Sequence, residues 1–296
     1  MSKLRVGVLR GGESSEYEVS LKTGASVLKH LARDKFEPQD IFIDREGRWH
    51  LAGLPAWPED VAEEVDVFFN ALHGEYGEDG QIQRLLNNLS KPFTGPEEIP
   101  AMAAMNKVTT KNLLSRAGIK TPSGMVIIAR ANNRESAKQV FNKLSPPWVV
   151  KPIDRGSSIG LSLAKSFDDL LAAIERAANF TEQILIEQYI AGKEGTVGVI
   201  DNFRGQPYYS LLPSGHERLT GEEKALLGEL AILAHETLGL RHYSEAGFIT
   251  TPRGPYLLEV DALPSLTADS TFSPALAAIG ANYHDFLTHI IEQALK

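Results

Sequence analysis

Residues 4–12 read Leu-Arg-Val-Gly-Val-Leu-Arg-Gly-Gly, an apolar run that ends in two glycines. The run has the length and composition of a buried strand. Apolar residues at near-helical spacing follow over residues 21–32, and residues 65–72 form a second apolar run that is rich in Val and Phe. Strand, glycine turn, helix and strand in this order predict a parallel α/β unit at the N-terminus.

Both predicted strands end in polar, glycine-rich loops, at residues 11–15 and 73–80. In open α/β sheets, ligands bind in the crevice beyond the carboxyl ends of the strands. We therefore expect these two loops to face one crevice.

The composition excludes several classes of protein. The 296 residues are 43% hydrophobic and 23% charged, which is typical of a globular protein, and the net charge of -8 disfavours broad binding to nucleic acid or to an anionic membrane. The chain has no Cys, so disulfides, thiolate nucleophiles and zinc–thiolate sites are excluded. No stretch approaches the ~18 apolar residues of a membrane span, and we expect a cytoplasmic protein.

Local signals divide the chain further. Three prolines lie within residues 91–100, where we place the first boundary. The predicted units are residues 1–98, 99–182 and 183–296. Helix caps are predicted at Asn106, Ser166 and Thr220, and strands at residues 183–189, 196–200 and 208–212, with a hairpin around residues 251–254.

Four blocks, in this order, make the chain resemble the D-alanine–D-alanine ligase family. They are Gly11-Gly-Glu-Ser-Ser-Glu-Tyr-Glu-Val-Ser20, His73-Gly-Glu-Tyr-Gly-Glu-Asp-Gly80, Lys151-Pro-Ile-Asp-Arg-Gly-Ser-Ser-Ile-Gly160 and Leu257-Leu-Glu-Val-Asp-Ala-Leu-Pro264. The resemblance implies an α/β protein of the ATP-grasp fold behind an N-terminal parallel-sheet domain, with ATP held between two sheets. It also implies a homodimer.

The resemblance further implies an ATP site. Lys107 and Lys151 contact phosphates, and the glycine loop 156–160, which carries Ser157 and Ser158, closes over them. The remaining implied ATP contacts are Glu187 and Ile190 at adenine and Glu194 at ribose. Two plainer interpretations stay open: each lysine pairs with a nearby carboxylate, and Glu194 is a solvated turn residue.

Glu259 and Asp261 alternate with apolar residues along a predicted strand, so both carboxylates lie on one face. Two converging acids repel one another unless a cation lies between them, and Mg²⁺ commonly combines one or two carboxylates with phosphates. The sequence therefore predicts a magnesium site, with an exposed strand face as the alternative. The family has Asn where this chain has Asp261.

For the amino-acid substrate, the resemblance assigns Glu16 to the amino group of the first D-alanine. It places His73 in the same crevice, although a His before a glycine can also merely hold a turn. Ser158, Ser265 and Ser270 complete the catalytic residues that the resemblance implies, together with Glu16.

Three departures from the family pattern stand out. By counting back from Glu259, the family's oxyanion-binding Arg and metal-binding Asp fall at about Ser244 and Ala246. The family's long lid loop is replaced by residues 212–220, which run almost directly into a helix. Ser265 stands where the family has a glycine.

The predicted function is an ATP- and magnesium-dependent ligase that joins two D-alanines, or similar amino acids, through an acyl phosphate for peptidoglycan synthesis. The missing Arg, Asp and lid leave two alternatives open: a nucleotide-binding relative that has lost the activity, and a ligase with another acceptor.

Overall fold

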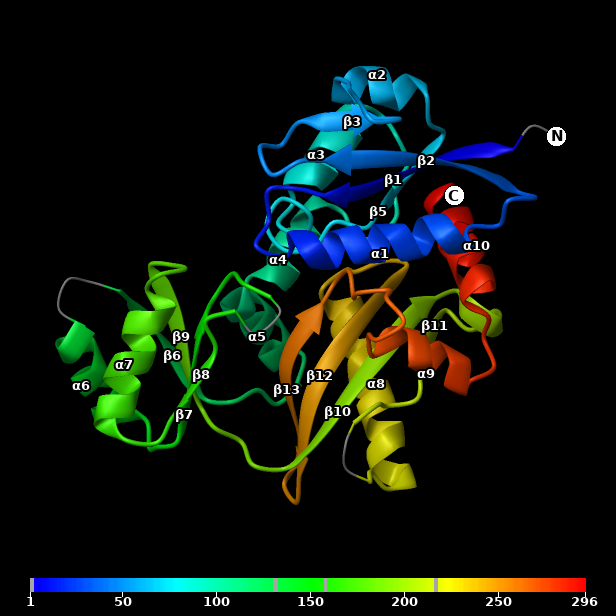
Figure 1. The fold of residues 1–296 in the computed structure, drawn as a ribbon. Helices are drawn as coiled ribbons and strands as arrows, with labels where there is room; N and C mark the ends of the chain where they lie inside the picture. Colours follow the sequence, from blue (N-terminus) through cyan, green and yellow to red (C-terminus); the bar gives the residue numbers. More distant parts are fainter. Residues whose placement is uncertain (1–2, 130–132, 157–158, 216–217) are drawn as a thin grey trace.

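The computed structural model describes residues 3–129, 133–156, 159–215 and 218–296, and its described strands form three sheets (Figure 1). In the N-terminal sheet, β1 (Leu4–Gly11) runs parallel to β2 (Phe36–Ile43) on one side and to β5 (Val67–Asn70) on the other. The short strands β3 (Trp49–Leu51) and β4 (Leu54–Pro55) extend the sheet beyond β2. The predicted parallel α/β unit is confirmed.

Helices cover both faces of the N-terminal sheet. Buried side chains of β1 pack with α1 (Tyr17–His30) and with the last helix, α10 (Tyr283–Ala294), in one apolar core. On the other face lie α2 (Pro58–Glu63) and α3 (Gln81–Asn88). The C-terminal helix α10 therefore packs against the N-terminal sheet.

The middle sheet is antiparallel, in the order β6 (Gly124–Ile128), β9 (Gln183–Gln188), β7 (Trp148–Pro152) and β8 (Ser162–Ala164). One face packs against α6 (Asn133–Lys143) and α7 (Phe167–Ala177). Because β9 pairs with β6 and β7, it belongs to this sheet, although it starts at the first residue of the third predicted unit. This pairing favours a boundary after Gln188, and the unit boundaries stay a prediction.

The C-terminal sheet is also antiparallel. Its order is β11 (Tyr208–Ser210), β10 (Lys193–Asp201), β12 (Tyr243–Thr251) and β13 (Gly254–Asp261), and β12 and β13 form the predicted hairpin. One face packs against α8 (Gly221–Thr237) and α5 (Lys107–Arg116). Three short elements remain: α4 (Glu98–Met105) before α5, the 3-10 turn η1 (Phe203–Gly205) between β10 and β11, and α9 (Phe272–Ala278) before α10.

The three predicted helix caps are confirmed. The side chain of Asn106 accepts hydrogen bonds from the backbone N–H groups of Val108 and Thr109, and capping boxes begin α7 at Ser166 and α8 at Thr220. These bonds satisfy backbone donors that the first turn of a helix leaves free. The cap at Asn106 also fixes where Lys107 enters α5.

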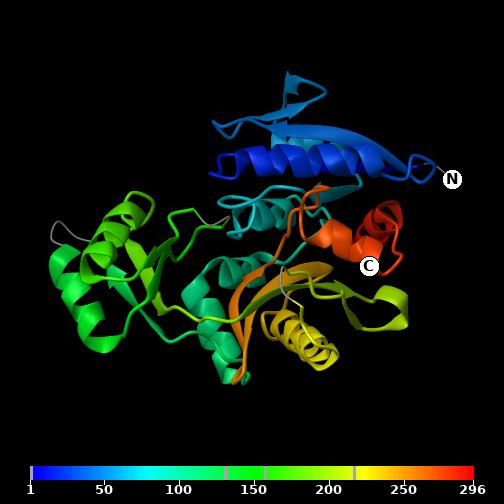
Figure 2. The same cartoon turned by 60° about the horizontal axis from the view of Figure 1, so that its bottom comes forward.

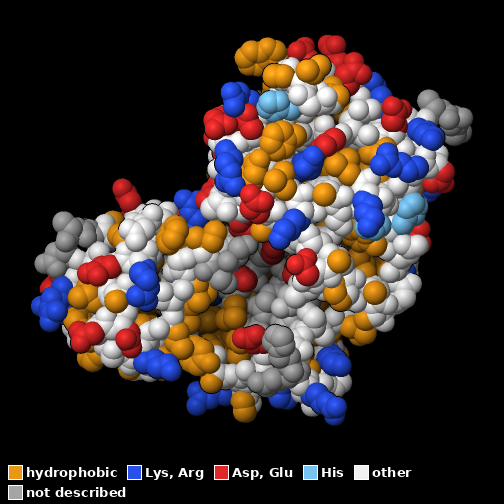
Figure 3. Space-filling model, viewed as in Figure 1, with side chains coloured by type: hydrophobic (Ala, Val, Ile, Leu, Met, Phe, Trp, Pro, Cys, Tyr) orange, Lys and Arg blue, Asp and Glu red, His pale blue; other side chains and the backbone are white. Residues whose placement is uncertain are grey.

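The middle sheet and its two helices stand to one side of the other two sheets (Figure 2). Figure 3 shows the surface hollowed between this unit and the rest of the molecule, with acidic side chains on the wall of the hollow. Among the described residues, no helix is long and apolar enough to cross a bilayer.

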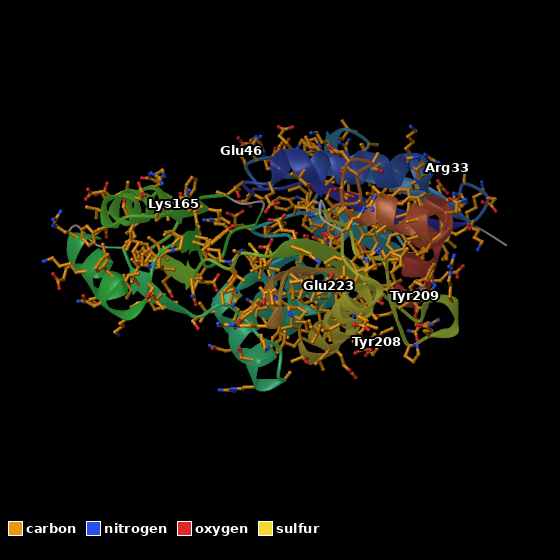
Figure 4. All side chains as sticks on the ribbon, turned by 90° about the horizontal axis from the view of Figure 1, so that it is seen from below. Arg33, Glu46, Lys165, Tyr208, Tyr209 and Glu223 are labelled. Atoms are coloured by element: carbon orange, nitrogen blue, oxygen red, sulfur yellow. The ribbon has the colours of Figure 1, made fainter. Side chains whose placement is uncertain are left out.

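The segment that replaces the lid follows β11, whose Tyr208 and Tyr209 lie away from Lys165 of the middle unit (Figure 4). Ser214 pairs with Thr196 of β10 through two backbone hydrogen bonds, of 2.8 and 2.9 Å. The described part of residues 211–220 thus lengthens the edge of the C-terminal sheet before α8 begins. His216 lies outside the described residues.

Candidate active site

A pocket forms where the three units meet. Its wall includes Glu16 from the N-terminal unit, Lys107 at the start of α5, and Glu259 and Asp261 on β13. These four residues are separated by up to 245 positions in the sequence, and each was predicted to act at the site. The pocket is also lined by Gly156, at the start of the predicted glycine loop, and by residues that were not predicted to act there: Glu78, Thr110 and Arg155.

The acidic wall comes from the alternation along β13. Glu259 and Asp261 point into the pocket while the side chains of Leu257 and Val260 are buried. Burial and the nearby Glu78 raise the pKa of Asp261 well above its usual range. Carboxylates held together in this way favour binding of a cation.

The chemistry of this wall fits magnesium. Carboxylate oxygens are the ligands that Mg²⁺ prefers, and it usually needs only one or two of them beside phosphates and water. Within the described ranges, no group of three or more His, Asp or Glu side chains is arranged to hold a metal ion by itself. The pocket therefore suits a metal that arrives with a nucleotide better than one held by protein alone.

The pairing of β12 with β13 bears on the positions that counting back from Glu259 gave to the family's Arg and Asp. Glu245 lies opposite Asp261 and Gly247 opposite Glu259, whereas the side chains of Ser244 and Ala246 lie on the other face, against α8. A β-bulge after Gly247 shifts the pairing by one residue, so a count through the hairpin reaches the wrong face. Allowing for the bulge, the count places the family's Arg and Asp at Glu245 and Gly247 instead, and this correspondence stays a prediction.

Lys107 lines the pocket together with the acids. The Nζ atom of Lys107 donates a hydrogen bond to the backbone O of Arg155, and burial lowers the pKa of Lys107. The negative charge of Glu259 raises the pKa of Lys107, and the positive charge of Lys151 lowers it. Lys151 itself does not line the pocket, so its contact with a magnesium nucleotide stays a prediction.

Glu187 is buried between two lysines. Its carboxylate oxygens lie 2.8 Å from Nζ of Lys151 and 2.7 Å from Nζ of Lys111. The plainer interpretation of Lys151, as the partner of a carboxylate, therefore describes this structure, and a contact of Glu187 with adenine stays a prediction. Burial lowers the pKa of Lys111 to about 8.

A second hollow opens beside this ion pair. It lies between α5 and the middle sheet, and its lining includes Val108, Lys111, Met125, Val126, Leu185 and Glu187. The predicted adenine and ribose residues Ile190 and Glu194 line neither this hollow nor the pocket, and Glu194 is exposed. Their roles stay predictions.

Replacing Glu187 with Gln is expected to destabilise the fold strongly. The substitution leaves two buried ammonium groups with one neutral partner, and removing one member of a buried ion pair costs about 3–5 kcal/mol. Urea denaturation would measure this change, with Glu182→Gln as the control because Glu182 is exposed just before β9. A loss below about 1 kcal/mol would show that the three charges are not coupled in the folded protein.

His73 does more than hold a turn. It is buried, with Nδ1 3.1 Å from Oε1 of Glu78 and Nε2 2.9 Å from Oγ1 of Thr23. Thr23 in turn lies 3.3 Å from the hydroxyl of Ser265. Burial lowers the pKa of His73, which favours the neutral imidazole. His73 and Ser265, predicted separately, are thus joined through Thr23.

Glu16 lies directly against the glycine loop. It is buried, and a Cβ atom added to Gly156 would come within 2.4 Å of its Oε1 atom. A glycine at position 156 therefore allows the backbone to approach the carboxylate. Ser157 and Ser158 lie outside the described residues. Ser270, whose hydroxyl donates to the backbone O of Thr267 at 2.8 Å, does not line the pocket.

Comparison with known proteins shows the family of the chain. The sequence model of the D-ala D-ala ligase N-terminus matches residues 5–59 and 53–96, and that of the C-terminus matches residues 113–211. The D-alanine–D-alanine ligase of Pelotomaculum thermopropionicum is 32% identical to the chain, over 99% of the chain and 97% of the relative. The chain belongs to the D-alanine–D-alanine ligase family. The ligase of Desulforamulus reducens is 33% identical, over 99% of both chains.

Solved structures of the family share the whole fold. D-alanyl-alanine synthetase A from Vibrio cholerae has a TM-score of 0.90 at 26% identity, over 100% of this chain and 99% of its own. The D-alanine–D-alanine ligase of Bacillus anthracis complexed with ATP has a TM-score of 0.82 at 28% identity, over 99% of this chain and 97% of its own. The predicted ATP-grasp fold is confirmed.

The family comparison also bears on the lid. The match to the C-terminal family model ends at residue 211, where the shortened segment begins. The alignment with the P. thermopropionicum ligase is 318 positions long, which exceeds the 296 residues of the chain. The relative therefore has residues that this chain lacks, as the predicted deletion requires.

Proposed function

We propose that the chain is an ATP- and magnesium-dependent ligase that joins two D-alanines for peptidoglycan synthesis. Its curated relatives are named D-alanine–D-alanine ligases, and nothing in the comparisons supports a loss of activity. The observation that carries the proposal is the convergence of Glu16, Lys107, Glu259 and Asp261 in one pocket.

The reaction has two steps. A carboxylate oxygen of the first D-alanine attacks the γ-phosphorus of ATP, which breaks the bond to ADP and gives an acyl phosphate. The amine of the second D-alanine then attacks the acyl carbon, loses a proton and expels inorganic phosphate. The products are the dipeptide, ADP and phosphate.

In this proposal, each charged residue of the site binds a group of opposite charge. Glu16 holds the ammonium group of the first substrate, and its burial strengthens that ion pair. Lys107 and Lys151 hold phosphate oxygens, and Glu259 and Asp261 would hold magnesium, which neutralises phosphate charge when bound. The neutral His73 steadies Glu78 and, through Thr23, the turn at Ser265.

The remaining predictions belong to this proposal. We place the reaction in the cytoplasm, where ATP is available, and we expect a homodimer, as the family resemblance implies. The predicted ranges are 1–98, 99–182 and 183–296; we keep the first boundary and move the second to after Gln188, the end of β9.

D-alanine-dependent release of ADP tests the proposed function. We expect ADP and D-alanyl-D-alanine in equal amounts when ATP, magnesium and D-alanine are present. ADP release with D-alanine but without dipeptide would contradict the ligase and indicate an ATPase. A dipeptide that forms only when a different amino acid is added would support another acceptor.

A further inference from the structure

The sheet face that carries Glu259 and Asp261 has an open position at Gly247. This glycine lies opposite Glu259, and a Cβ atom added to it would meet only Cγ of Glu259, at an ordinary contact distance of 3.7 Å. A side chain fits there without strain. It is also the position that the count predicts for the family's metal-binding Asp once the β-bulge is taken into account.

An unused carboxylate lies two residues earlier on the same strand. Glu245 is opposite Asp261, so the two side chains are neighbours on one face of the sheet. The hydroxyl of Thr271, just before α9, lies 2.6 and 2.7 Å from its two carboxylate oxygens. Burial and Glu259 raise the pKa of Glu245, and Glu245 contributes to the raised pKa of Asp261.

We infer that Glu245 compensates for the acid missing at Gly247, as a third carboxylate that supports the magnesium site without binding the ion directly. The inference rests on the proposed function. Because no three acids among the described residues are arranged to bind one ion directly, Glu245 acts as a positioning residue that accepts a hydrogen bond from metal-bound water. Thr271 keeps the carboxylate in place for this contact.

A purely structural role of Glu245 predicts a different result for its variants. If Glu245 only accepts the hydrogen bond of Thr271, a Gln side chain serves as well, because its amide oxygen is also an acceptor. Only a role toward the cation requires the negative charge. Glu245→Gln therefore separates the two roles, and Glu245→Gln combined with Gly247→Asp returns an acid to the family position.

Binding of Mn²⁺ to the full chain with ADP, followed by electron paramagnetic resonance, tests the inference without turnover. We expect Glu245→Gln to weaken Mn²⁺ binding about 10- to 100-fold, the usual effect of losing a carboxylate that orients metal-bound groups. The double variant is expected to regain most of this loss, and Gly247→Asp alone to bind Mn²⁺ at least as tightly as the unsubstituted chain. Glu229→Gln, at an exposed position of α8, is the matched control.

Two results would overturn the inference: an unchanged Mn²⁺ affinity in Glu245→Gln, or a loss that Gly247→Asp does not reverse in the double variant. Circular dichroism of each variant confirms that a loss does not come from unfolding. If the unsubstituted chain binds no Mn²⁺ with ADP, the proposed function itself fails, and the inference fails with it. Failure of the inference alone leaves the binding of the unsubstituted chain intact.

Discussion

Replacing Glu259 with Gln is expected to lower kcat/KM for D-alanine about 100- to 1000-fold, the range for removing one group that stabilises charge in a transition state. Glu259 lies on the pocket wall beside Asp261, and its charge raises the pKa of the half-buried Lys107 in the same pocket. The substitution keeps the shape of the side chain and removes its charge. The acids would then hold magnesium less well, and charge on the transferred phosphoryl group would be poorly neutralised.

Steady-state ADP release over a range of magnesium concentrations measures this effect. Excess magnesium should restore part of the activity, because the loss comes from weaker metal binding. Glu175→Gln is the control, since Glu175 is exposed on α7. Full activity of Glu259→Gln at low magnesium would contradict the assignment of this strand to the metal.

Glu16→Gln is expected to reduce kcat/KM for D-alanine about 30- to 5000-fold, which corresponds to the 2–5 kcal/mol lost when one partner of a buried charge pair is removed. Glu16 is only 8% exposed and lies against the backbone at Gly156, so its charge is poorly screened by water. An ammonium group beside it would lose its counter-charge. Affinity for ADP with magnesium should stay the same, because the phosphates bind at the lysines.

Two measurements separate these effects: ADP release as a function of D-alanine, and calorimetric titration with ADP and magnesium. Glu18→Gln serves as the control, since Glu18 is exposed on α1. Equal loss of ADP affinity and D-alanine activity would assign Glu16 to the nucleotide instead.

Local features of the fold could be predicted from the sequence because their causes are local. The caps at Asn106, Ser166 and Thr220 depend on residues within one helical turn, and each begins a helix where expected. The strand β2 was not predicted, since three polar residues and a Pro follow Phe36 in its sequence, Phe-Glu-Pro-Gln-Asp-Ile-Phe-Ile. Its place beside β1 comes from long-range pairing.

Apart from Glu259 and Asp261, whose alternation along the chain indicated a shared face, the site was predicted only as far as the resemblance named its residues. Glu78 lies within the block of residues 73–80 that resembles the family, yet it was not predicted to line the pocket. Lys111 could not be linked to Glu187, which is 76 positions away, before the middle sheet and α5 were placed together. The face of Glu245 depends on a β-bulge in the hairpin, which spacing in the sequence does not reveal.

The central claim is that a carboxylate of one D-alanine takes the γ-phosphoryl group of ATP in this pocket. The most direct measurement uses D-alanine labelled with ¹⁸O in both carboxylate oxygens and mass spectrometry of the inorganic phosphate formed. The acyl-phosphate mechanism predicts one ¹⁸O atom in each phosphate released with dipeptide, because that oxygen leaves with the phosphoryl group. Phosphate without ¹⁸O from the amino acid would contradict the account.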